Sequence, residues 1–401
     1  MTDKPAILQV IPHLGVGGAE LSTVEIVDAL SAIGVRTLVA TQGGRMVADV
    51  ERLGGEVILM KAATKNPVQI MRNKGLLEQL IDEHNILLVH ARSRAPAWTS
   101  LLAARNKKIP FVTTYHGAYG ELGPFKRLYN SVMSRGDKVI ANSQFTGELV
   151  RERYQIEEDR LRIIYRGAEI SRFSKSAVTA DRSSKLRASW GAPEGCRIVF
   201  HPARMTRLKG HGVVIEGLKK FLERGGDQNI MVIFAGDYQG RDAYMDELRH
   251  KVMDLGVEKH VKFVGHCADM PAAYGLAHVS IIASTEPETF GRTSAEAQAM
   301  GCPVIATNIG APPETVRAEP FVSKNETTGW LVPPSDPEAL AEALFAALKM
   351  GPEDHQQLAG RAIENIRHCF SDQLMKAQTL AVYDELLGTE FAARYKEASR
   401  D

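Results

Sequence analysis

One stretch in the second half of the chain constrains the fold more than any other. It begins with a short apolar run, residues 278–283, of a length typical of a buried strand, and a loop with two acids follows. Residues 292–300 are strong or neutral helix formers, and Gly301 with Pro303 ends that helix. Residues 304–306 then form the next apolar run. An order of strand, loop, helix and strand favours an α/β sheet.

The same alternation of apolar runs and helical patterns fills the rest of the chain, which at 401 residues is long enough for two domains. A segment rich in Ser, Lys, Arg and Ala separates two sets of alternating units, as expected of an interdomain connection. The sequence therefore predicts two Rossmann-like, doubly wound α/β domains. We expect the first domain at residues 1–170, the connection at 171–194, the second domain at 195–371 and a helical tail at 372–401.

Two acids flank the start of the predicted helix: Glu288 in the preceding loop and Glu296 inside it, on the face that carries Arg292. Free N–H groups at a helix start, together with the helix dipole, form an anion site. A ligand with a diphosphate and flanking hydroxyls would fit there, with Glu296 on ribose hydroxyls and Glu288 on sugar hydroxyls. The alternative is that Glu296 is a solvated helix residue and Glu288 a capping acid.

A glycine-rich turn that includes Gly17 and Gly18 joins a strand at residues 6–11 to a helix at 21–33. Glycine lets the backbone approach an anion closely, so the turn is a candidate phosphate-facing loop. The alternative is a plain tight turn. A dinucleotide-binding site is disfavoured, because the glycine spacing differs and the second strand ends at Thr41 without an acid.

Three polar residues follow strands of the first domain. Arg92 and Arg94 come after the strand at 86–90, where they could meet an anionic acceptor; solvated surface arginines are the alternative. His116 follows the strand at 110–115, and ligands of open α/β sheets bind beyond the carboxyl ends of strands.

The sequence around Glu288 and Glu296 resembles the Glu-x7-Glu signature of the retaining glycosyltransferases of family 4. Phe290-Gly291 and the pattern Glu-Ala-x-Ala-x-Gly-x-Pro-Val flank it, and Gln298 stands where that family often has Met. The resemblance to this family extends over roughly the whole chain. The resemblance implies the GT-B arrangement, in which two domains face across a cleft and the C-terminal helix crosses back to brace the first domain. It also implies transfer of a hexose from a nucleotide sugar to a hydroxyl group, with retention of configuration.

The resemblance also implies roles for individual residues. Arg204 and Lys209 match the family's Arg and Lys-Gly pair, which would stabilise the departing diphosphate. His116, in Thr-Tyr-His-Gly, matches the family histidine near the transferred sugar, which Glu288 would also orient. One departure is Arg166, where the family usually has Asn. Besides Arg204 and Lys209, the expected donor-binding residues are Gly17, Gly18, Gly265, His266, Glu288, Thr289, Phe290, Gly291 and Glu296.

Within the family, residues 91–98 and 113–119 resemble bacterial lipopolysaccharide-core mannosyltransferases. That finer resemblance implies GDP-mannose as the donor and a glycan or lipid-linked acidic sugar as the acceptor. Residues 1–170 carry a net charge of +4 and the remainder −3. The mildly basic first half suits an acidic acceptor, or peripheral contact with the cytoplasmic face of the inner membrane.

Bulk properties exclude several other classes. The net charge of +1 argues against a general nucleic-acid binder. Four scattered cysteines, without a Cys-x-x-Cys pair, predict reduced thiols and no zinc site. No Asp-x-Asp occurs, so we expect no metal and no cofactor, the nucleotide sugar being a substrate. With neither a signal-peptide pattern nor an apolar run of about 18 residues, we expect a cytoplasmic protein.

Two other functions remain open on sequence grounds. A nucleotide-sugar epimerase or hydrolase on the same architecture would form an epimer or free sugar without an acceptor. A non-catalytic scaffold of the same fold is disfavoured because Glu288, Glu296, Arg204, Lys209 and His116 are all present.

Overall fold

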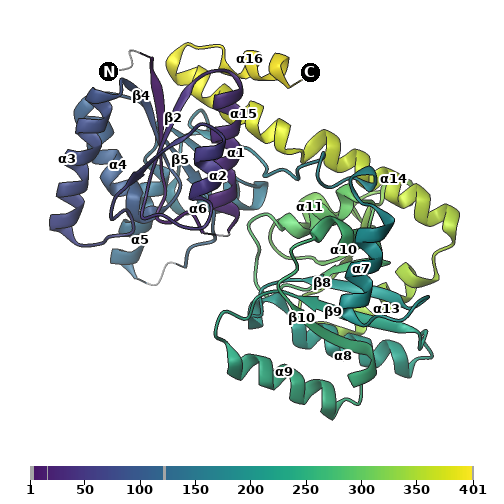
Figure 1. Ribbon diagram of the computed structural model, residues 1–401. Helices are drawn as coiled ribbons and strands as arrows, with labels where there is room; N and C mark the ends of the chain where they lie inside the picture. The colour runs from purple at the N-terminus through teal and green to yellow at the C-terminus, as the bar shows by residue number, and fades with distance from the viewer. Residues whose placement is uncertain (1–3, 16, 121–122, 400–401) are drawn as a thin grey trace. The chain divides into compact units, whose positions relative to one another are not determined.

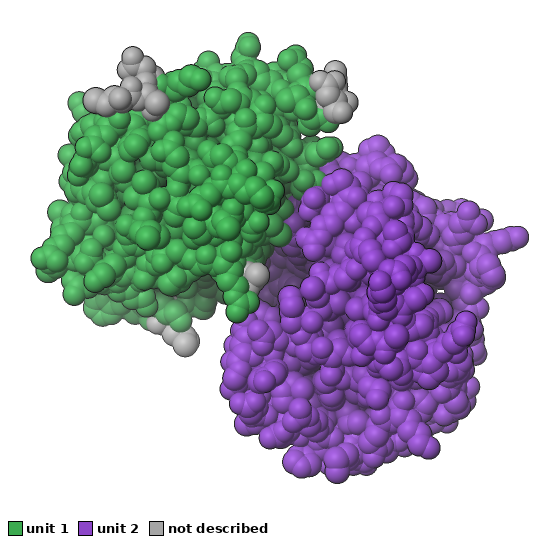
Figure 2. All heavy atoms as spheres, viewed as in Figure 1, with its two compact units in different colours: residues 1–166, 372–401 green, residues 167–371 purple. Residues whose placement is uncertain are grey.

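The computed structural model describes residues 4–15, 17–120 and 123–399. The chain divides into two compact units, coloured separately in Figure 2. Unit 1 comprises residues 1–166 and 372–401, and unit 2 comprises residues 167–371.

Unit 1 contains, in its described residues, a seven-stranded parallel sheet with strand order β3-β2-β1-β4-β5-β6-β7 (Figure 1). Helices cover both faces of this sheet, so its strands are nearly continuous apolar runs; all five residues of β1 are buried. The strands are Ala6–Val10 (β1), Arg36–Thr41 (β2), Glu56–Leu59 (β3), Ile86–Ala91 (β4), Phe111–Tyr115 (β5), Lys138–Ala141 (β6) and Leu161–Ile163 (β7).

The helices of unit 1 come from both ends of the chain. Two C-terminal helices pack against α1, and α15 also contacts β4. Buried Leu380 and Tyr383 of α15 lie in one apolar cluster with Ile7 and Leu88 of the sheet. The helices are Gly18–Ala32 (α1), Val47–Arg52 (α2), Pro67–Glu83 (α3), Arg94–Lys107 (α4), Pro124–Asn130 (α5), Gln144–Tyr154 (α6), Asp372–Leu387 (α15) and Phe391–Ala398 (α16).

Unit 2 contains, in its described residues, a six-stranded parallel sheet with order β10-β9-β8-β11-β12-β13. Its strands are Arg197–Pro202 (β8), Ile230–Ala235 (β9), Val261–Gly265 (β10), Val279–Ile282 (β11), Val304–Thr307 (β12) and Gly329–Val332 (β13). Its helices are Ala180–Trp190 (α7), His211–Glu223 (α8), Asp242–Asp254 (α9), Met270–Leu276 (α10), Arg292–Ala299 (α11), Pro312–Thr315 (α12), Pro337–Lys349 (α13) and Pro352–Cys369 (α14).

The predicted fold class, two doubly wound α/β domains, is confirmed by these two sheets. The strand, loop, helix and strand unit that we predicted in the second half is β11, α11 and β12, with ends within one or two residues of the expected ones. Residues 171–194, which we expected to be the interdomain connection, include α7 and lie in unit 2. Trp190 at the end of α7 is buried and stacks on Phe200, with the ring centroids 5.8 Å apart.

Candidate functional site

An ion pair lies at the carboxyl edge of the unit 2 sheet. The loop after β8 carries Lys209 and the loop after β11 carries Glu288; β8 and β11 are neighbours, so these loops meet. The Lys209 Nζ atom lies 2.6 Å from Glu288 Oε1, and the Ser284 hydroxyl donates to the same oxygen. The two charged side chains are only 25% and 16% exposed, which strengthens their electrostatic attraction.

Glycines allow the close approach of these loops. Gly210, directly after Lys209, has φ 70°, and a Cβ there would lie 1.8 Å from the carbonyl oxygen of Ala283. Gly310, after β12, has φ 75°, and a Cβ there would lie 2.5 Å from the carbonyl oxygen of Glu288. Both positions therefore require glycine, and the backbone around Lys209 and Glu288 is fixed by contact between loops.

The helix α11 begins next to this pair. Gly291 is its N-cap, with φ 78° and no side-chain cap, and the first helical residue is Arg292. One turn inside the helix, Glu296 accepts a hydrogen bond from Arg292 Nε at 3.2 Å, as the i,i+4 spacing predicts. The Tyr274 hydroxyl donates to Glu296 Oε2 at 3.4 Å. The Glu296 side chain is 13% exposed, so the alternative of a solvated helix residue is wrong.

The pKa of the Glu296 carboxyl is raised from its ordinary value, because burial disfavours the charged form. The neighbouring guanidinium of Arg292 opposes that increase. Burial also raises the pKa of the Tyr274 hydroxyl well above its ordinary value, so this group remains a hydrogen-bond donor near neutral pH.

The other unit 2 residues expected at the donor site differ in accessibility. Arg204 and His266 are exposed, and Thr289 is half-buried. Gly265 ends β10 with φ 67° and open space beside it. Phe290 is only 2% exposed, and its ring packs 6.2 Å from that of Phe370. Any contact of Phe290 with a donor is therefore confined to its backbone.

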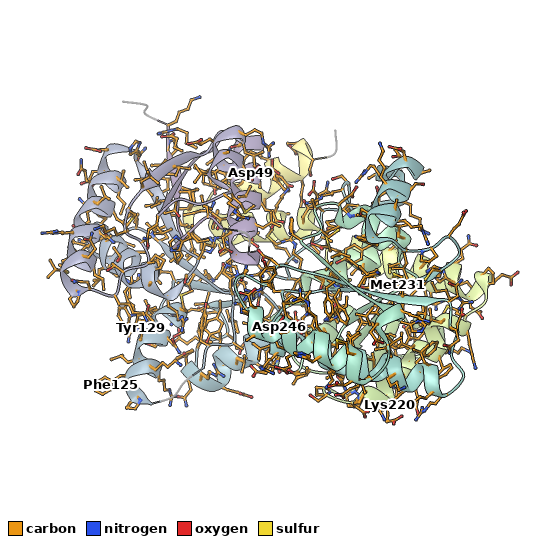
Figure 3. All side chains as sticks on the ribbon, turned by 60° about the horizontal axis from the view of Figure 1, so that its bottom comes forward. Asp49, Phe125, Tyr129, Lys220, Met231 and Asp246 are labelled. Atoms are coloured by element: carbon orange, nitrogen blue, oxygen red, sulfur yellow. The ribbon has the colours of Figure 1, made fainter. Side chains whose placement is uncertain are left out.

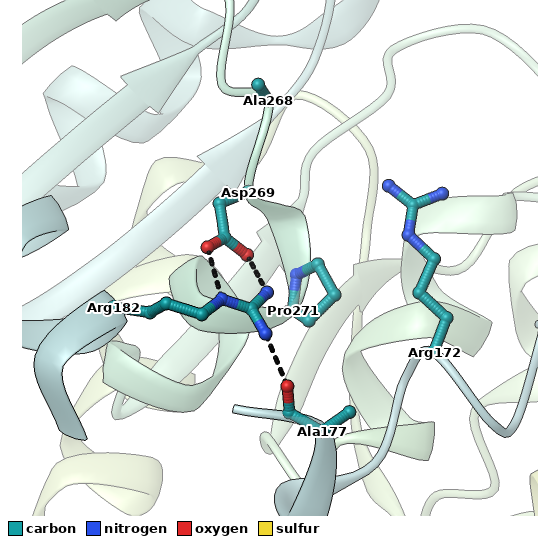
Figure 4. Close-up of a pocket in the computed structure, with 6 residues that line it drawn as sticks. All are labelled: Arg172, Ala177, Arg182, Ala268, Asp269 and Pro271. Carbon is teal, nitrogen blue, oxygen red and sulfur yellow. Dashed lines mark hydrogen bonds and ion pairs between the residues drawn. The ribbon is translucent and has the colours of Figure 1, made fainter. Parts of the chain in front are cut away.

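A hollow of about 290 Å³ lies beside the N-terminus of α10 (Figure 4). On one side, Arg182 makes two bonds to Asp269, with Nε–Oδ2 at 2.9 Å and Nη2–Oδ1 at 2.6 Å. Asp269 also caps α10 by accepting from the Ala272 N–H, so this ion pair joins α7 to α10. The guanidinium of Arg172 lies on the other side of the hollow.

In unit 1, three motifs singled out in the sequence meet. His116 follows β5, and its Nδ1 atom lies 2.6 Å from Nη2 of Arg166. The same guanidinium lies against the glycine-rich turn, since a Cβ on Gly18 would be 2.1 Å from Arg166 Nη1. A Cβ on Gly17 would be 2.3 Å from the Glu20 carboxylate. These two glycines therefore make room for neighbouring charged side chains.

Arg92 and Arg94, the two arginines expected near an acceptor, differ in their surroundings. Arg92 is 3% exposed and donates from Nε to Gln9 Oε1 at 3.1 Å, so it is neither a solvated nor an acceptor-facing arginine. Arg94 is half-buried, with its guanidinium 4.0 Å from the ring centroid of Tyr119 and Nη1 2.9 Å from Asn130 Oδ1.

A buried polar network that the sequence analysis missed surrounds Arg92. His90 Nε2 lies 2.7 Å from the Thr114 hydroxyl, and its Nδ1 lies 2.7 Å from the hydroxyl of Tyr383 on α15. Thr114 also accepts from Arg92 Nη1 at 3.5 Å. The sequence did contain a sign of this network: a polar residue, Gln9 or His90, inside an otherwise apolar strand.

Among the described residues, no cluster of three or more His, Cys, Asp or Glu side chains could hold a metal ion.

Comparisons with known proteins identify the family. Residues 16–172 match the family described as Glycosyltransferase Family 4, and residues 182–367 match Glycosyl transferases group 1. The chain is 34% identical to a crystal structure of a glycosyltransferase from Rickettsia africae, with a TM-score of 0.88 and coverage of 97% of this chain and 100% of that one. The chain belongs to the GT-B glycosyltransferases.

Three further relatives of this glycosyltransferase have lower sequence identity to it. A D-inositol 3-phosphate glycosyltransferase from Corynebacterium glutamicum is 30% identical over 261 residues, which span 65% of this chain and 60% of that protein. A D-inositol 3-phosphate glycosyltransferase from Jonesia denitrificans is 26% identical, with 83% of each chain covered. HepE from Anabaena, solved in complex with UDP, has a TM-score of 0.81 at 23% identity and 96% and 100% coverage, and shares the fold.

The comparisons confirm the predicted glycosyltransferase class and its family 4 domain. The curated relatives just described are named for inositol 3-phosphate, so they do not support the finer resemblance to lipopolysaccharide-core mannosyltransferases.

Two buried histidines lie close together in unit 2 of this glycosyltransferase. His201, in β8, and His211, at the start of α8, are 1% and 0% exposed, with ring centroids 4.8 Å apart. Burial lowers the pKa of His201 to about 4 and that of His211 to about 2. The unfolded chain therefore binds more protons than the folded one below the ordinary pKa of 6.5.

We predict that these two histidines leave the free energy of unfolding unchanged above about pH 7 and lower it below about pH 6.5, by up to ~1.4 kcal/mol per pH unit for each of them. His211→Phe should lose less stability on acidification than the wild type, because it removes one of these groups while keeping a ring. His250→Phe, at an exposed position, should match the wild type. Denaturant unfolding at pH 7.5, 6 and 5 measures the differences; equal acid losses in all three proteins would contradict the assignment.

Proposed function

We propose that this chain transfers a hexose from a nucleotide sugar to a hydroxyl group of an acceptor, with retention of configuration at the anomeric carbon. The observation that carries the proposal is the meeting of Lys209, Glu288 and the start of α11, which no side chain of its N-cap residue caps, at one sheet edge. This arrangement brings a cation and the backbone N–H groups of a helix start beside a carboxylate. The cation and the N–H groups suit a diphosphate, and the carboxylate suits sugar hydroxyls.

In this proposal, the departing diphosphate is stabilised by Lys209, by exposed Arg204 and by the N–H groups at the start of α11. Negative charge grows on the leaving oxygen in the transition state, and fixed positive groups lower its energy there more than in the ground state. Lys209 is pre-organised by Glu288, so little reorganisation is needed when the donor binds.

Glu288 has capacity for the sugar as well as for Lys209. Its Oε1 atom accepts from both Lys209 and Ser284. None of the described residues donates a hydrogen bond to Glu288 Oε2. This oxygen can therefore accept one from a sugar hydroxyl. We assign Glu296 to the ribose hydroxyls, with Arg292 and Tyr274 holding its carboxylate in place.

We infer that the acceptor carries a negative charge. The mannosyltransferase resemblance implies an acidic lipid-linked sugar, with GDP-mannose as donor, while the curated relatives are named for inositol 3-phosphate. Both acceptors are anionic and rich in hydroxyls. In unit 1, the half-buried Arg94 suits such a group, whereas the guanidinium of Arg92 is buried against Gln9.

An epimerase or hydrolase would use the same donor site. It would release an epimer or free sugar in the absence of any acceptor, so product analysis separates it from a transferase. Donor identity can be found first by thermal shift, because a ligand that binds only the folded state raises its melting temperature. A chain that no nucleotide sugar stabilises, and that consumes none with either acceptor class, would contradict the proposal.

We predict that Lys209→Ala lowers kcat about 100-fold or more, because it removes positive charge at the departing diphosphate. Arg207→Ala is the matched control: this exposed arginine lies in the same short turn but pairs with Glu247. It should retain near wild-type turnover. Both rates are measured by release of the nucleoside diphosphate at saturating donor. Equal activity in the two variants would remove Lys209 from the reaction.

We also propose a cytoplasmic protein with peripheral contact between unit 1 and an anionic membrane. None of the helices in the described residues is long and apolar enough to cross a bilayer. Two neighbouring segments instead present exposed apolar side chains, and Lys65 Nζ, 5.4 Å from the ring centroid of Tyr129, joins them. Figure 3 labels Phe125 and Tyr129 on one of these segments, α5.

We define the basic apolar surface as Val68, Met71, Phe125 and Leu128 with Lys65, Arg72, Lys126 and Arg127. The four apolar side chains are 55–87% exposed. Residues 61–77 contain four basic residues and residues 123–130 contain two. Neither segment contains Asp or Glu. Exposed apolar groups surrounded by cations match a membrane interface with acidic headgroups.

We predict that the protein sediments with vesicles containing phosphatidylglycerol and not with pure phosphatidylcholine, and that salt weakens this binding. The double variant Phe125→Ala/Leu128→Ala should bind several-fold more weakly. Phe321→Ala, at an exposed residue of unit 2, is the control and should bind as the wild type does. Undiminished binding of the double variant would contradict the assignment of this surface.

A further inference from the structure

Arg166 has an unusual position for an arginine that follows a strand. It comes three residues after the end of β7, yet its guanidinium contacts His116, which follows β5, and lies against Gly18 at the start of α1. It therefore joins three separate segments of unit 1. The family that the sequence resembles usually has Asn at this position, which is shorter and uncharged.

The contact fixes which nitrogen of His116 carries the proton. An arginine side chain has only donors and keeps its charge at any working pH. Because Nη2 of Arg166 lies 2.6 Å from Nδ1 of His116, Nδ1 must accept this hydrogen bond. A neutral imidazole with an accepting Nδ1 has its proton on Nε2.

The surroundings of His116 also keep its ring neutral. Burial lowers the pKa of His116 well below its ordinary value, and the positive charges of Arg166 and Arg92 lower it further. Among the described residues, His90 and Tyr119 are further titratable groups near it; burial keeps His90 neutral and raises the pKa of Tyr119 to about 12. No change of protonation near His116 is therefore expected between about pH 6 and 9.

We propose that Arg166 is a positioning residue that fixes His116 as a hydrogen-bond donor, through Nε2–H, to an oxygen atom of the bound sugar. A ring in this state cannot accept a proton at Nε2, so His116 does not act as a general base from that nitrogen. This inference rests on the proposed sugar transfer only for the identity of the group that receives the hydrogen bond. The tautomer and its cause are properties of the protein alone.

The first test needs no substrate. In the full chain labelled with ¹⁵N-histidine, the signals of His116 are identified by their loss in His116→Gln. The wild type should show the Nε2–H tautomer and no titration between pH 6 and 8. Arg166→Asn should give a mixture of tautomers and a pKa displaced upward, because a neighbouring positive charge is lost. Arg166→Lys, which keeps a charged donor, should resemble the wild type more closely.

Two further variants separate this effect from a general loss of structure. In Gly18→Ala, the new methyl group would lie 2.1 Å from Arg166 Nη1, so it should push the intact guanidinium away from His116 and shift its signals in the same direction. Arg135→Gln changes an exposed arginine that lies 5.1 Å from the ring centroid of Trp98, and should leave His116 unchanged.

Kinetics give the second test. In Arg166→Asn, the acid limb of kcat/KM should move to higher pH by half a unit or more, whereas Arg166→Lys should retain the wild-type profile. A wild-type His116 with its proton on Nδ1, or tautomer and pH profile both unchanged in Arg166→Asn, would overturn the proposal. If the protein transferred no sugar at all, the proposed function would fail, but the ¹⁵N spectra would still decide the role of Arg166.

Discussion

The close approach of three loops, those after β8, β11 and β12, at the carboxyl edge of the unit 2 sheet is the constraint on which the donor site depends. Gly210 lies against the backbone of Ala283 and Gly310 lies against that of Glu288, both at distances that no Cβ would allow. These contacts hold the backbones on either side of the Lys209–Glu288 pair. A partly buried ion pair contributes little net free energy if its partners move, because desolvation offsets much of the attraction. Because the loops are held in place, Lys209 and Glu288 keep the geometry in which they attract each other.

In unit 1, polar side chains hold two arginines, Arg92 and Arg166, in place. Arg92 is held among Gln9, Thr114 and, through Thr114, His90, while Arg166 contacts the glycine-rich turn and His116. Two arginines near one histidine favour its neutral form. Burying a guanidinium requires that its donors be satisfied, which explains why this edge of the sheet contains so many polar residues.

The sequence predicted features that depend on neighbours along the chain. Apolar runs gave the strands, and the i,i+4 spacing gave the contact between Arg292 and Glu296. It could not predict contacts between distant segments, such as Lys209 with Glu288, 79 residues apart, or Arg166 with His116, 50 residues apart. The inward orientation of Arg92 depends on tertiary packing, so residue type alone misplaced it.

Separate roles for Glu288 and Glu296 form the central claim, and calorimetry tests it most directly. Two ligands are titrated: the nucleoside diphosphate, which contains the ribose but no sugar, and the intact donor. Glu296→Gln should weaken binding of both ligands by roughly 1–3 kcal/mol, the usual effect of removing a charged acceptor. Glu288→Gln should keep the affinity for the nucleoside diphosphate and weaken only the donor. If Glu288→Gln loses the bare nucleotide as severely as Glu296→Gln does, the two carboxylates act as one nucleotide clamp and the account is wrong.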